Sequence, residues 1–463
     1  MKIIILFFLV LVSPFWMHAQ NNVLTFEDFI GLVLEHHPMS RQADVKNEYG
    51  IANLQKSKGN FDPKLEGNIN QKYFKSDKYY NVSNIGLKVP TWYGISFKGG
   101  YDMNNGTQLN PERLTPEEGL WYAGVEVSLG KGLIIDKRRA EFKKAQIYAQ
   151  SAIQERRIML NDLVLKSGSA YWEWFKSYNK MTVYEKAVAN SQEVMDNVRR
   201  GALVGDRPFM DTLEAHVQLQ TQKFNFLKTE VDYLNSLAYL EIFLWKDGYL
   251  PLELDSLTFP PSMYEVDKST IEPELLLKVD SLKINHPSLL QANYKIESEK
   301  ITLKLAWENV KPEIDLKYNA INSAEFGNPA ENYSIENYVW GASFKMPLFL
   351  RKERNQIRLS KLKVELKQLD FEMKTQEIGF KIESAINLWQ TSNTQIDLWS
   401  QTTGDYEILL QNENQLYTIG ESSLFKVNSR QKSYIKSELM LIETIKENQK
   451  AALKAKYILG ILN

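Results

Sequence analysis

Four segments of the chain alternate apolar and polar side chains, residue by residue. They are residues 64–73, 121–129, 313–320 and 340–346. A period of two residues predicts β-strands, each with one apolar and one polar face. Segments of about ten residues with aromatic ends are typical of a transmembrane β-barrel that has a polar lumen. A half-buried sheet of a water-soluble protein produces the same alternation, so the pattern alone leaves both interpretations open.

A further pair of alternating stretches lies between Asn84 and Met103, on either side of a turn at residues 90–94. The turn contains proline and glycine, which interrupt strands, so the pair is predicted to form a β-hairpin. The pattern leaves open whether this hairpin joins the barrel wall or stands outside the membrane.

Two long segments predict helices, because proline is absent from residues 137–198 and from residues 352–419. A helix of roughly 65 residues is about 100 Å long, far beyond an ordinary helix of a globular domain. Apolar residues recur at helical spacing within the second segment and in the segment that follows the first. They are Leu213, Val217, Phe224, Leu227, Val231, Leu234, Ala238, Leu362, Leu366, Leu369, Met373 and Phe380. Such a stripe suits contacts between neighbouring helices, in a helical wall or in an antiparallel coiled coil.

The chain carries the same pattern twice. An offset of 249 residues places His37 on His286 and Pro63 on Pro312, and an offset of 215 residues places Gly205 on Gly420. Each repeat runs helix, strands, very long helix, tight turn and long helix. The glycines mark the turns at which each long helix folds back, and Asp206 or Ser422 is predicted to accept hydrogen bonds from the first amides of the next helix.

The repeats define the predicted domain organisation. Residues 20–250 are the first repeat and residues 274–463 are the second. Residues 251–273 between them contain several prolines and little periodicity, so they are predicted to be a linker along the outside of the helical body. Residues 1–19 have the basic start, the apolar run and the polar end of a secretory signal peptide.

Composition excludes several classes of protein. The chain has 56 basic and 57 acidic residues and no block of like charge, so it lacks the basic face that nucleic-acid binding requires. It contains no cysteine, which excludes disulfides and cysteine-based metal sites. After the signal peptide no apolar run approaches about 18 residues, so strands are the remaining way to cross a bilayer.

The candidate chemistry does not indicate an enzyme. The five histidines are scattered, without acidic residues at metal-ligand spacing, so we expect no metal, no cofactor and no catalytic site. His37 and His286 precede prolines at helix breaks, where a capping role is expected. Trp172 and Trp174 are predicted to be packing residues.

The residues after the signal peptide resemble the TolC-like outer membrane factor family. The resemblance lies in the order and duplication of several short motifs. They are Leu24 to Asp28 with His37-Pro38, Ala170 to Trp172, Gly341 to Phe349, Tyr417 to Gly420, and Leu459-Gly460. The resemblance implies an α+β membrane protein in which the duplicated unit forms a homotrimer. Strands from three chains would close one β-barrel in the outer membrane, continued by a long α-helical barrel across the periplasm.

The resemblance also implies a function. The chain would be the outer membrane exit channel of a tripartite efflux pump or a type I secretion system, a passive conduit gated at its periplasmic helical tip. Its partners would be outer membrane lipid, a periplasmic adaptor (a membrane fusion protein) and an inner-membrane pump of the RND or ABC type. The alternative is a non-channel periplasmic coiled-coil adaptor, which would need neither the alternating strands nor the duplication.

The functional residues implied by the resemblance lie near the two turn glycines. Counting from these glycines assigns a gate latch to Tyr417 and Asp211. The family's second latch, an arginine, is replaced by Ser422, and Lys426 and Ser429 occupy the positions of its acidic pore constriction. The turns are expected to contact the adaptor through Gly205, Asp206, Arg207, Gly420, Glu421 and Ser422.

Overall fold

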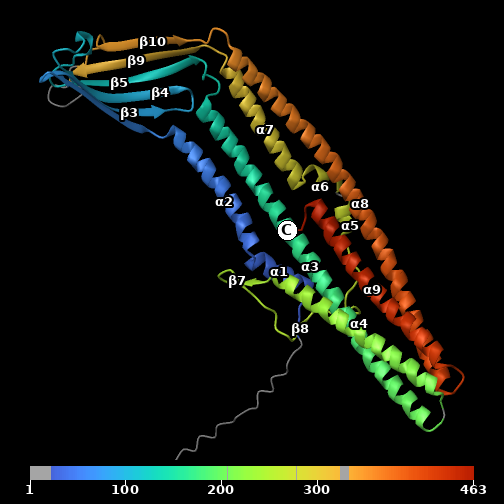
Figure 1. Ribbon diagram of the computed structural model, residues 1–463. Helices are drawn as coiled ribbons and strands as arrows, with labels where there is room; N and C mark the ends of the chain where they lie inside the picture. Colours follow the sequence, from blue (N-terminus) through green and yellow to red (C-terminus); the bar gives the residue numbers. More distant parts are fainter. Residues whose placement is uncertain (1–21, 206, 278, 324–332, 463) are drawn as a thin grey trace, which may run out of the picture. The chain divides into compact units, whose positions relative to one another are not determined.

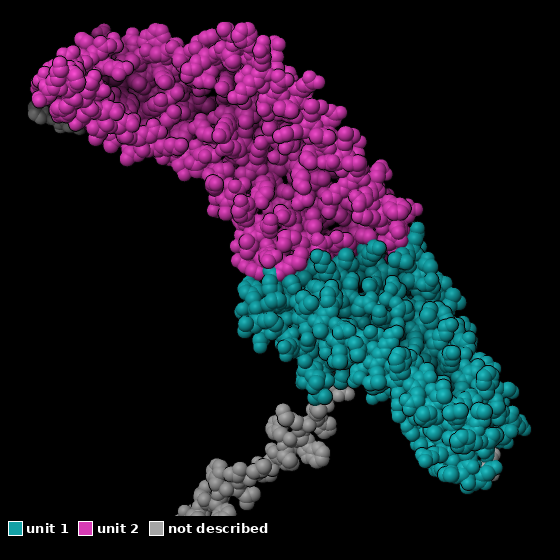
Figure 2. Space-filling model, in the orientation of Figure 1, with its two compact units in different colours: residues 1–38, 163–270, 386–455 teal, residues 39–162, 271–385, 456–463 magenta. Residues whose placement is uncertain are grey.

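The computed structural model describes residues 22–205, 207–277, 279–323 and 333–462. The chain forms two compact units, which Figure 2 shows in different colours. Unit 1 contains residues 1–38, 163–270 and 386–455, and unit 2 contains residues 39–162, 271–385 and 456–463. Each unit takes residues from both predicted repeats, so the boundaries of the repeats remain a prediction. The predicted signal peptide, residues 1–19, lies outside the described residues.

Unit 2 contains a six-stranded antiparallel sheet (Figure 1). In chain order its strands are β2 (Lys64–Phe74), β3 (Asp77–Pro90), β4 (Ile95–Asn105), β5 (Leu120–Gly130), β9 (Glu313–Ser323) and β10 (Tyr338–Lys345). In space the order is β10-β9-β5-β4-β3-β2, so β5 and β9 join the two repeats. The four predicted strands are confirmed. The hairpin predicted between Asn84 and Met103 belongs to the same sheet, as β3 and β4.

The apolar face of the sheet is open in the single chain. Leu65, Ile69, Trp340 and Phe344 are all largely exposed, although each belongs to the apolar set of its strand. β2 and β10 lie at the two ends of the strand order, so each pairs with a neighbour on one side only. A free strand edge presents unpaired amides and carbonyls, which makes it a template for pairing with another chain.

Two very long helices confirm the helical predictions. They are α3 (Lys137–Leu203), of 67 residues, and α8 (Arg351–Thr418), of 68 residues, and each contributes to both units. After the turns follow α4 (Phe209–Glu241) and α9 (Leu424–Leu459). The shorter helices are α1 (Phe26–His36), α2 (Pro38–Lys58), α5 (Pro273–Leu277), α6 (Val279–Ile284) and α7 (Pro287–Glu308). No helix within the described ranges has the length and apolarity to cross a bilayer.

An aromatic cluster joins α1 to α3 in unit 1. Phe29, Tyr171 and Trp174 are completely buried, and Trp172 is nearly so. The rings of Phe29 and Tyr171 lie 5.4 Å apart, and the Tyr171 hydroxyl donates to the carbonyl oxygen of Leu24 over 2.8 Å. The phenol therefore keeps a polar partner while its ring is packed. The predicted packing role of the two tryptophans is confirmed.

The residues between the repeats lie against the helices of unit 1. β8 (Thr258–Phe259) pairs in parallel with β1 (Asn22–Val23). Further along, the amide of Met263 donates to Asn179 Oδ1 over 2.9 Å, and the Tyr264 hydroxyl donates to Glu438 over 3.1 Å. These side chains belong to α3 and α9, so the linker is tied to both helices.

The two histidines at helix breaks differ. His286 is the N-cap residue of α7, where its Nδ1 accepts from the amide of Ser288 over 3.1 Å, so its predicted capping role is confirmed. His37 ends α1 through its backbone, whose amide donates to the Val33 carbonyl oxygen over 3.1 Å. Its ring stacks on Phe243 with the ring centres 6.0 Å apart. Packing therefore places the side chain of His37.

Candidate functional site at the helical turns

The α3–α4 turn begins with a left-handed glycine. Gly205 has φ of +82°, and a side chain at this position would meet nothing within 4 Å. Glycine is therefore favoured by the backbone conformation and not by crowding. Pro208, whose ring fixes φ near this value, is the N-cap residue of α4 with φ of −63°. Asp206 lies outside the described residues, so its predicted capping role stays a prediction.

The α8–α9 turn closes with a pair of backbone hydrogen bonds around Gly420, whose φ is +81°. The amide of Glu421 donates to the Leu416 carbonyl oxygen over 2.9 Å, and the amide of Gly420 donates to the Tyr417 carbonyl oxygen over 3.2 Å. This is a Schellman motif, which satisfies carbonyls that the end of a helix leaves free. The motif fixes Tyr417 in the last turn of α8.

The cap of α9 corrects one sequence-based prediction. Ser423, and not Ser422, receives the helix amide: the backbone N–H of Lys426 donates to Ser423 Oγ over 3.4 Å. The Ser422 hydroxyl instead donates to Glu413 of α8. Arg430 of α9 also contacts Glu413, with 3.5 Å between Nε and Oε2. The hydrogen bond from Ser422 lowers the pKa of Glu413, and Arg430 and Lys426 act in the same direction. Glu413 therefore joins α8 to the turn and to α9.

Tyr417 rests on a small apolar cluster that joins all four helices at the turns. Val198 of α3, Ala215 of α4 and Leu424 of α9 are buried together, and Tyr417 of α8 packs against them. Contacts of this kind hold the ends of two helical hairpins together in one chain. The position of the tyrosine ring is therefore set by packing as well as by the turn.

Arg207, from the opposite turn, covers the ring of Tyr417. The guanidinium carbon lies 4.2 Å from the ring centre, which is a cation–π contact, and Nη1 donates to the phenol oxygen. Burial raises the pKa of Tyr417; Arg207 opposes this shift, whereas Asp211 and Glu214 reinforce it. One cation and two carboxylates thus act electrostatically on the phenol of Tyr417.

Asp211 lies in the first turn of α4, close enough to influence the phenol of Tyr417 electrostatically. Within the part of the chain that the structure describes, no hydrogen bond joins the two side chains. The phenol oxygen of Tyr417 is held by Arg207 of the same chain instead. The predicted Tyr417–Asp211 latch therefore remains a prediction.

The other predicted site residues lie at the surface. Lys426 and Ser429 are exposed on α9, and their pore-lining role stays a prediction. Gly205, Gly420 and Glu421 are exposed at the two turns, whereas Arg207 and Ser422 are half-buried. The structure thus brings Arg207 and Tyr417 together, which the sequence did not predict. One signal was available, because the 215-residue offset aligns Arg207 with Ser422 and so exposes a difference between the two turns.

A cavity of about 550 Å³ adjoins Arg207 and Tyr417 in unit 1. Its wall combines amide, acidic and apolar side chains from α3, α8 and α9. The lining residues are Asn190, Glu193, Val194, Asn197, Val198, Arg207, Leu410, Asn414, Tyr417, Thr418, Val427 and Gln431. No group of three or more acidic or histidine side chains in the described ranges is arranged to hold a metal ion.

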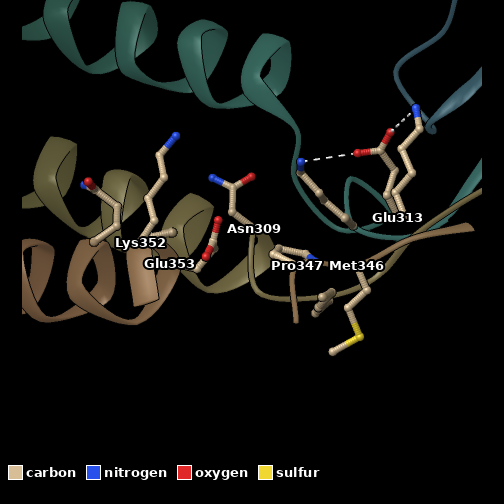
Figure 3. Close-up of a pocket in the computed structure, with 11 residues that line it drawn as sticks. Asn309, Glu313, Met346, Pro347, Lys352 and Glu353 are labelled. Carbon is tan, nitrogen blue, oxygen red and sulfur yellow. Dashed lines mark hydrogen bonds and ion pairs between the residues drawn. The ribbon is translucent and has the colours of Figure 1, made fainter. Parts of the chain in front are cut away.

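A second cavity, of about 520 Å³, lies in unit 2 where α7 ends and α8 begins, next to the ends of strands β9 and β10 (Figure 3). Glu313 at one side of this cavity lies between two lysines, with Nζ of Lys131 at 3.3 Å and Nζ of Lys345 at 3.8 Å. Asn309 and Lys352 line it from the helices. The lysines beside Glu313 thus have an acidic partner.

The long helical hairpins and the sheet together define the fold of outer membrane channels. The chain is similar to the open state of the Neisseria gonorrhoeae MtrE outer membrane channel, with a TM-score of 0.68 and 13% identity over 94% of this chain and 88% of MtrE. It is also similar to the Campylobacter jejuni CmeC outer membrane channel, with a TM-score of 0.64 and 13% identity over 95% and 86% of the two chains. For the outer membrane protein VceC of Vibrio cholerae the TM-score is 0.63, with 12% identity over 94% and 96%.

A match to a protein family covers the second half of the chain. The profile of the family described as outer membrane efflux protein matches residues 279–455. No curated protein matches the chain significantly. The predicted resemblance is confirmed: residues 279–455 match the family described as outer membrane efflux protein, and nearly the whole chain shares its fold with outer membrane channels of known structure. The description of the matched family agrees with the expected outer membrane location.

Proposed function

We propose that this chain is the outer membrane exit channel of a tripartite efflux pump or a type I secretion system, and that it works as a homotrimer. The observation that carries the proposal is the combination of unpaired sheet edges with exposed apolar stripes on the long helices. A single chain leaves both without a partner in the described structure, and copies of the same chain supply both partners at once.

The helical stripes support association of identical chains. Every apolar residue of α4 and α8 in this set is exposed in the single chain, by 47% to 72% of its surface. The set is Leu213, Val217, Phe224, Leu227, Val231, Leu234, Leu362, Leu366, Leu369, Met373 and Phe380. Exposed apolar surface of this extent marks an interaction surface in soluble parts of proteins. Burial against neighbouring helices contributes about 25 cal/mol per Å² of apolar area.

The sheet supports the same assembly. β10 of one copy can pair with β2 of the next, so three copies close a barrel without free edges. Each copy contributes six strands, which gives a circumference large enough for an aqueous lumen. The exposed apolar side chains of the strands, such as Ile69 and Phe344, would then face lipid.

The turns are the proposed gate and adaptor contact. In this proposal the strands lie in the outer membrane, the helices lie in the periplasm, and the turns are the periplasmic end of the channel. Tyr417 and Asp211 are proposed as the latch that closes this end, and Lys426 and Ser429 are proposed to line the pore there. Gly205, Asp206, Arg207, Gly420, Glu421 and Ser422 are proposed to contact a periplasmic adaptor, which couples the channel to an inner-membrane pump.

The alternative, a non-channel coiled-coil adaptor, is less well supported. It accounts for the helical hairpins and for their apolar stripes. It leaves unexplained why both repeats contribute strands to one sheet, with β5 paired to β9 along eleven residues.

The assembly can be tested in detergent. The extracted protein should have the mass of three chains after subtraction of detergent, as measured by light scattering. Phe224→Glu and Leu366→Glu place charges in the exposed stripes and should yield monomers. Leu114→Glu, at a similarly exposed apolar residue in the loop between β4 and β5, is the control and should remain trimeric. A stable, detergent-free monomer of the wild-type protein would refute the channel proposal.

The orientation can be tested in cells. A cysteine at Glu421 should crosslink to a co-expressed adaptor, because this exposed residue lies at the α8–α9 turn. A cysteine at Ile69, on the sheet, is the matched control and should not crosslink. Labelling of the Glu421 cysteine by an impermeant reagent from outside intact cells would contradict the proposed orientation.

A further inference from the structure

Arg207 is the only described side chain that touches both the face and the oxygen of Tyr417. Its guanidinium lies over the ring at 4.2 Å from the ring centre, and Nη1 donates to the hydroxyl oxygen. In the described part of the chain, no carboxylate forms an ion pair with Arg207. Among the described residues, Tyr417 is therefore the principal partner of this cation.

The contact joins the two repeats. Arg207 follows the turn glycine of the first repeat, whereas Tyr417 precedes the turn glycine of the second. The apolar cluster beneath the ring also takes residues from both hairpins, namely Val198, Ala215 and Leu424. A movement of one hairpin end relative to the other would have to break the arginine–tyrosine contact and expose this cluster.

The hydroxyl group of Tyr417 can take part in two hydrogen bonds, one as acceptor and one as donor. A phenol oxygen can accept one hydrogen bond while its own proton is donated to another group. Because Arg207 supplies the donor, the proton of Tyr417 remains available to an acceptor. The carboxylates that act on the phenol are Asp211 and Glu214, and Glu214 Oε1 already accepts from Asn428 Nδ2 over 2.9 Å. The Asp211 side chain has no hydrogen bond within the described residues, so we take it as the acceptor.

We propose that Arg207 is the positioning residue of the gate: it clamps Tyr417 to the opposite turn and directs the phenol proton towards a carboxylate of Asp211. A cation that donates to a phenol oxygen strengthens the hydrogen bond which that phenol donates, because linked hydrogen bonds polarise one another. The Arg207–Tyr417 contact and the Tyr417–Asp211 latch therefore form one hydrogen-bond network. Loss of Arg207 weakens closure of the channel although Tyr417 and Asp211 are unchanged. This inference rests on the proposed gated channel.

The test is single-channel conductance of purified trimers in planar bilayers. Arg207→Gln removes the cation and should increase the open fraction on the order of tenfold, as expected for loss of one charge-assisted hydrogen bond. Arg207→Lys keeps the positive charge but lacks the planar guanidinium group. Its open fraction should therefore lie between those of the wild type and Arg207→Gln. Arg199→Gln is the matched control, because Arg199 is exposed near the end of α3 and has no recorded contact with Tyr417.

A double-mutant comparison separates this role from general destabilisation. Tyr417→Phe removes the hydroxyl and keeps the ring. If Arg207 acts through the phenol, Arg207→Gln should add little to the effect of Tyr417→Phe, whereas a merely structural role predicts that the two effects add. A second readout is the ionisation of a fluorinated tyrosine at position 417, followed by fluorine NMR. Its pKa should rise in Arg207→Gln, because the neighbouring cation that opposes the effect of burial is lost.

The outcomes are distinct. If Tyr417→Phe opens the channel while Arg207→Gln leaves conductance unchanged, the inference is wrong and the proposed gate stands. Additive effects of the two substitutions would likewise overturn it. If wild-type trimers form no channel, the proposed function fails and the inference fails with it. If Arg207→Gln does not assemble, the comparison of Arg207→Lys with wild type decides, and equal open fractions would overturn the inference.

Discussion

The backbone amide of Ser269 donates to the side-chain oxygen of Asn448 over 2.8 Å. Asn448 is completely buried in α9, and its amide nitrogen donates to Ser392 Oγ and to Asn393 Oδ1 of α8. One side chain therefore satisfies polar groups of the linker and of another helix. A buried amide with all its hydrogen bonds made is a strong determinant of how these elements fit together.

We expect Asn448→Ala to destabilise unit 1. The substitution leaves the Ser269 amide, Ser392 Oγ and Asn393 Oδ1 without their partner, and the loss of these hydrogen bonds costs about 2–4 kcal/mol. The measurement is the midpoint of chemical unfolding followed by circular dichroism. Asn412→Ala, at an exposed asparagine of α8, is the control and should change the midpoint little. Equal midpoints for both variants would contradict the assigned role of Asn448.

The proposed latch predicts a gain of permeability. Replacement of Tyr417 with Phe together with Asp211 with Ala should increase single-channel conductance and admit bulky antibiotics to cells. A phenol that donates to a carboxylate contributes about 1.5–3 kcal/mol, and the proposed homotrimer would contain three such hydrogen bonds. Trimer assembly is checked first by light scattering. Unchanged conductance in assembled trimers would show that the gate lies elsewhere.

The proposed pore-lining role of Lys426 leads to a prediction about the ion selectivity of the channel. This exposed lysine is close enough to Glu413 to help lower the pKa of that carboxyl, so its charge belongs to the region of the turns. Lys426→Glu should shift the reversal potential of the channel towards cation selectivity. Lys432→Glu supplies the same change of charge on an exposed side chain further along α9. A shift of the same size in both variants would argue for general surface charge and against a pore-lining Lys426.

The lowered pKa of His286 predicts that the folded chain loses stability in mild acid. Burial lowers the pKa of His286 to about 4 from its ordinary value of 6.5, and Lys374 and Arg157 act in the same direction. The unfolded chain therefore binds this proton more readily than the folded chain. The contribution is fully present above pH 6.5 and is lost as the pH falls towards about 4. Because the ring is partly exposed, the loss is about 1 kcal/mol.

The variant His286→Asn keeps a side-chain acceptor at the N-cap and removes the titration. Its thermal midpoint should fall less than that of the wild type between pH 7 and pH 5. His216→Asn, at an exposed histidine of α4, should behave as the wild type does. An identical fall in all three proteins would exclude His286 as the source of the pH dependence.

The sequence by itself determined the strands, the long helices and the two turns. Alternation of side chains is a local property, so β2, β5, β9 and β10 could be predicted from their own residues. The ends of α3 and α8 could be predicted for the same reason. Gly205 and Gly420 are glycines, which adopt the left-handed conformation that ends a helix.

Only the tertiary structure decided which side chains meet. The placement of β3 and β4 inside the sheet depends on pairing between distant strands. The capping of α9 by Ser423, one residue after the expected Ser422, depends on the Schellman motif that ends α8 and on the attraction of Ser422 to Glu413. Arg207 meets Tyr417 because packing aligns the ends of two helical hairpins. Local periodicity predicts an apolar stripe on each helix. Which residues of two helices lie opposite one another is set by the close packing of many side chains at once.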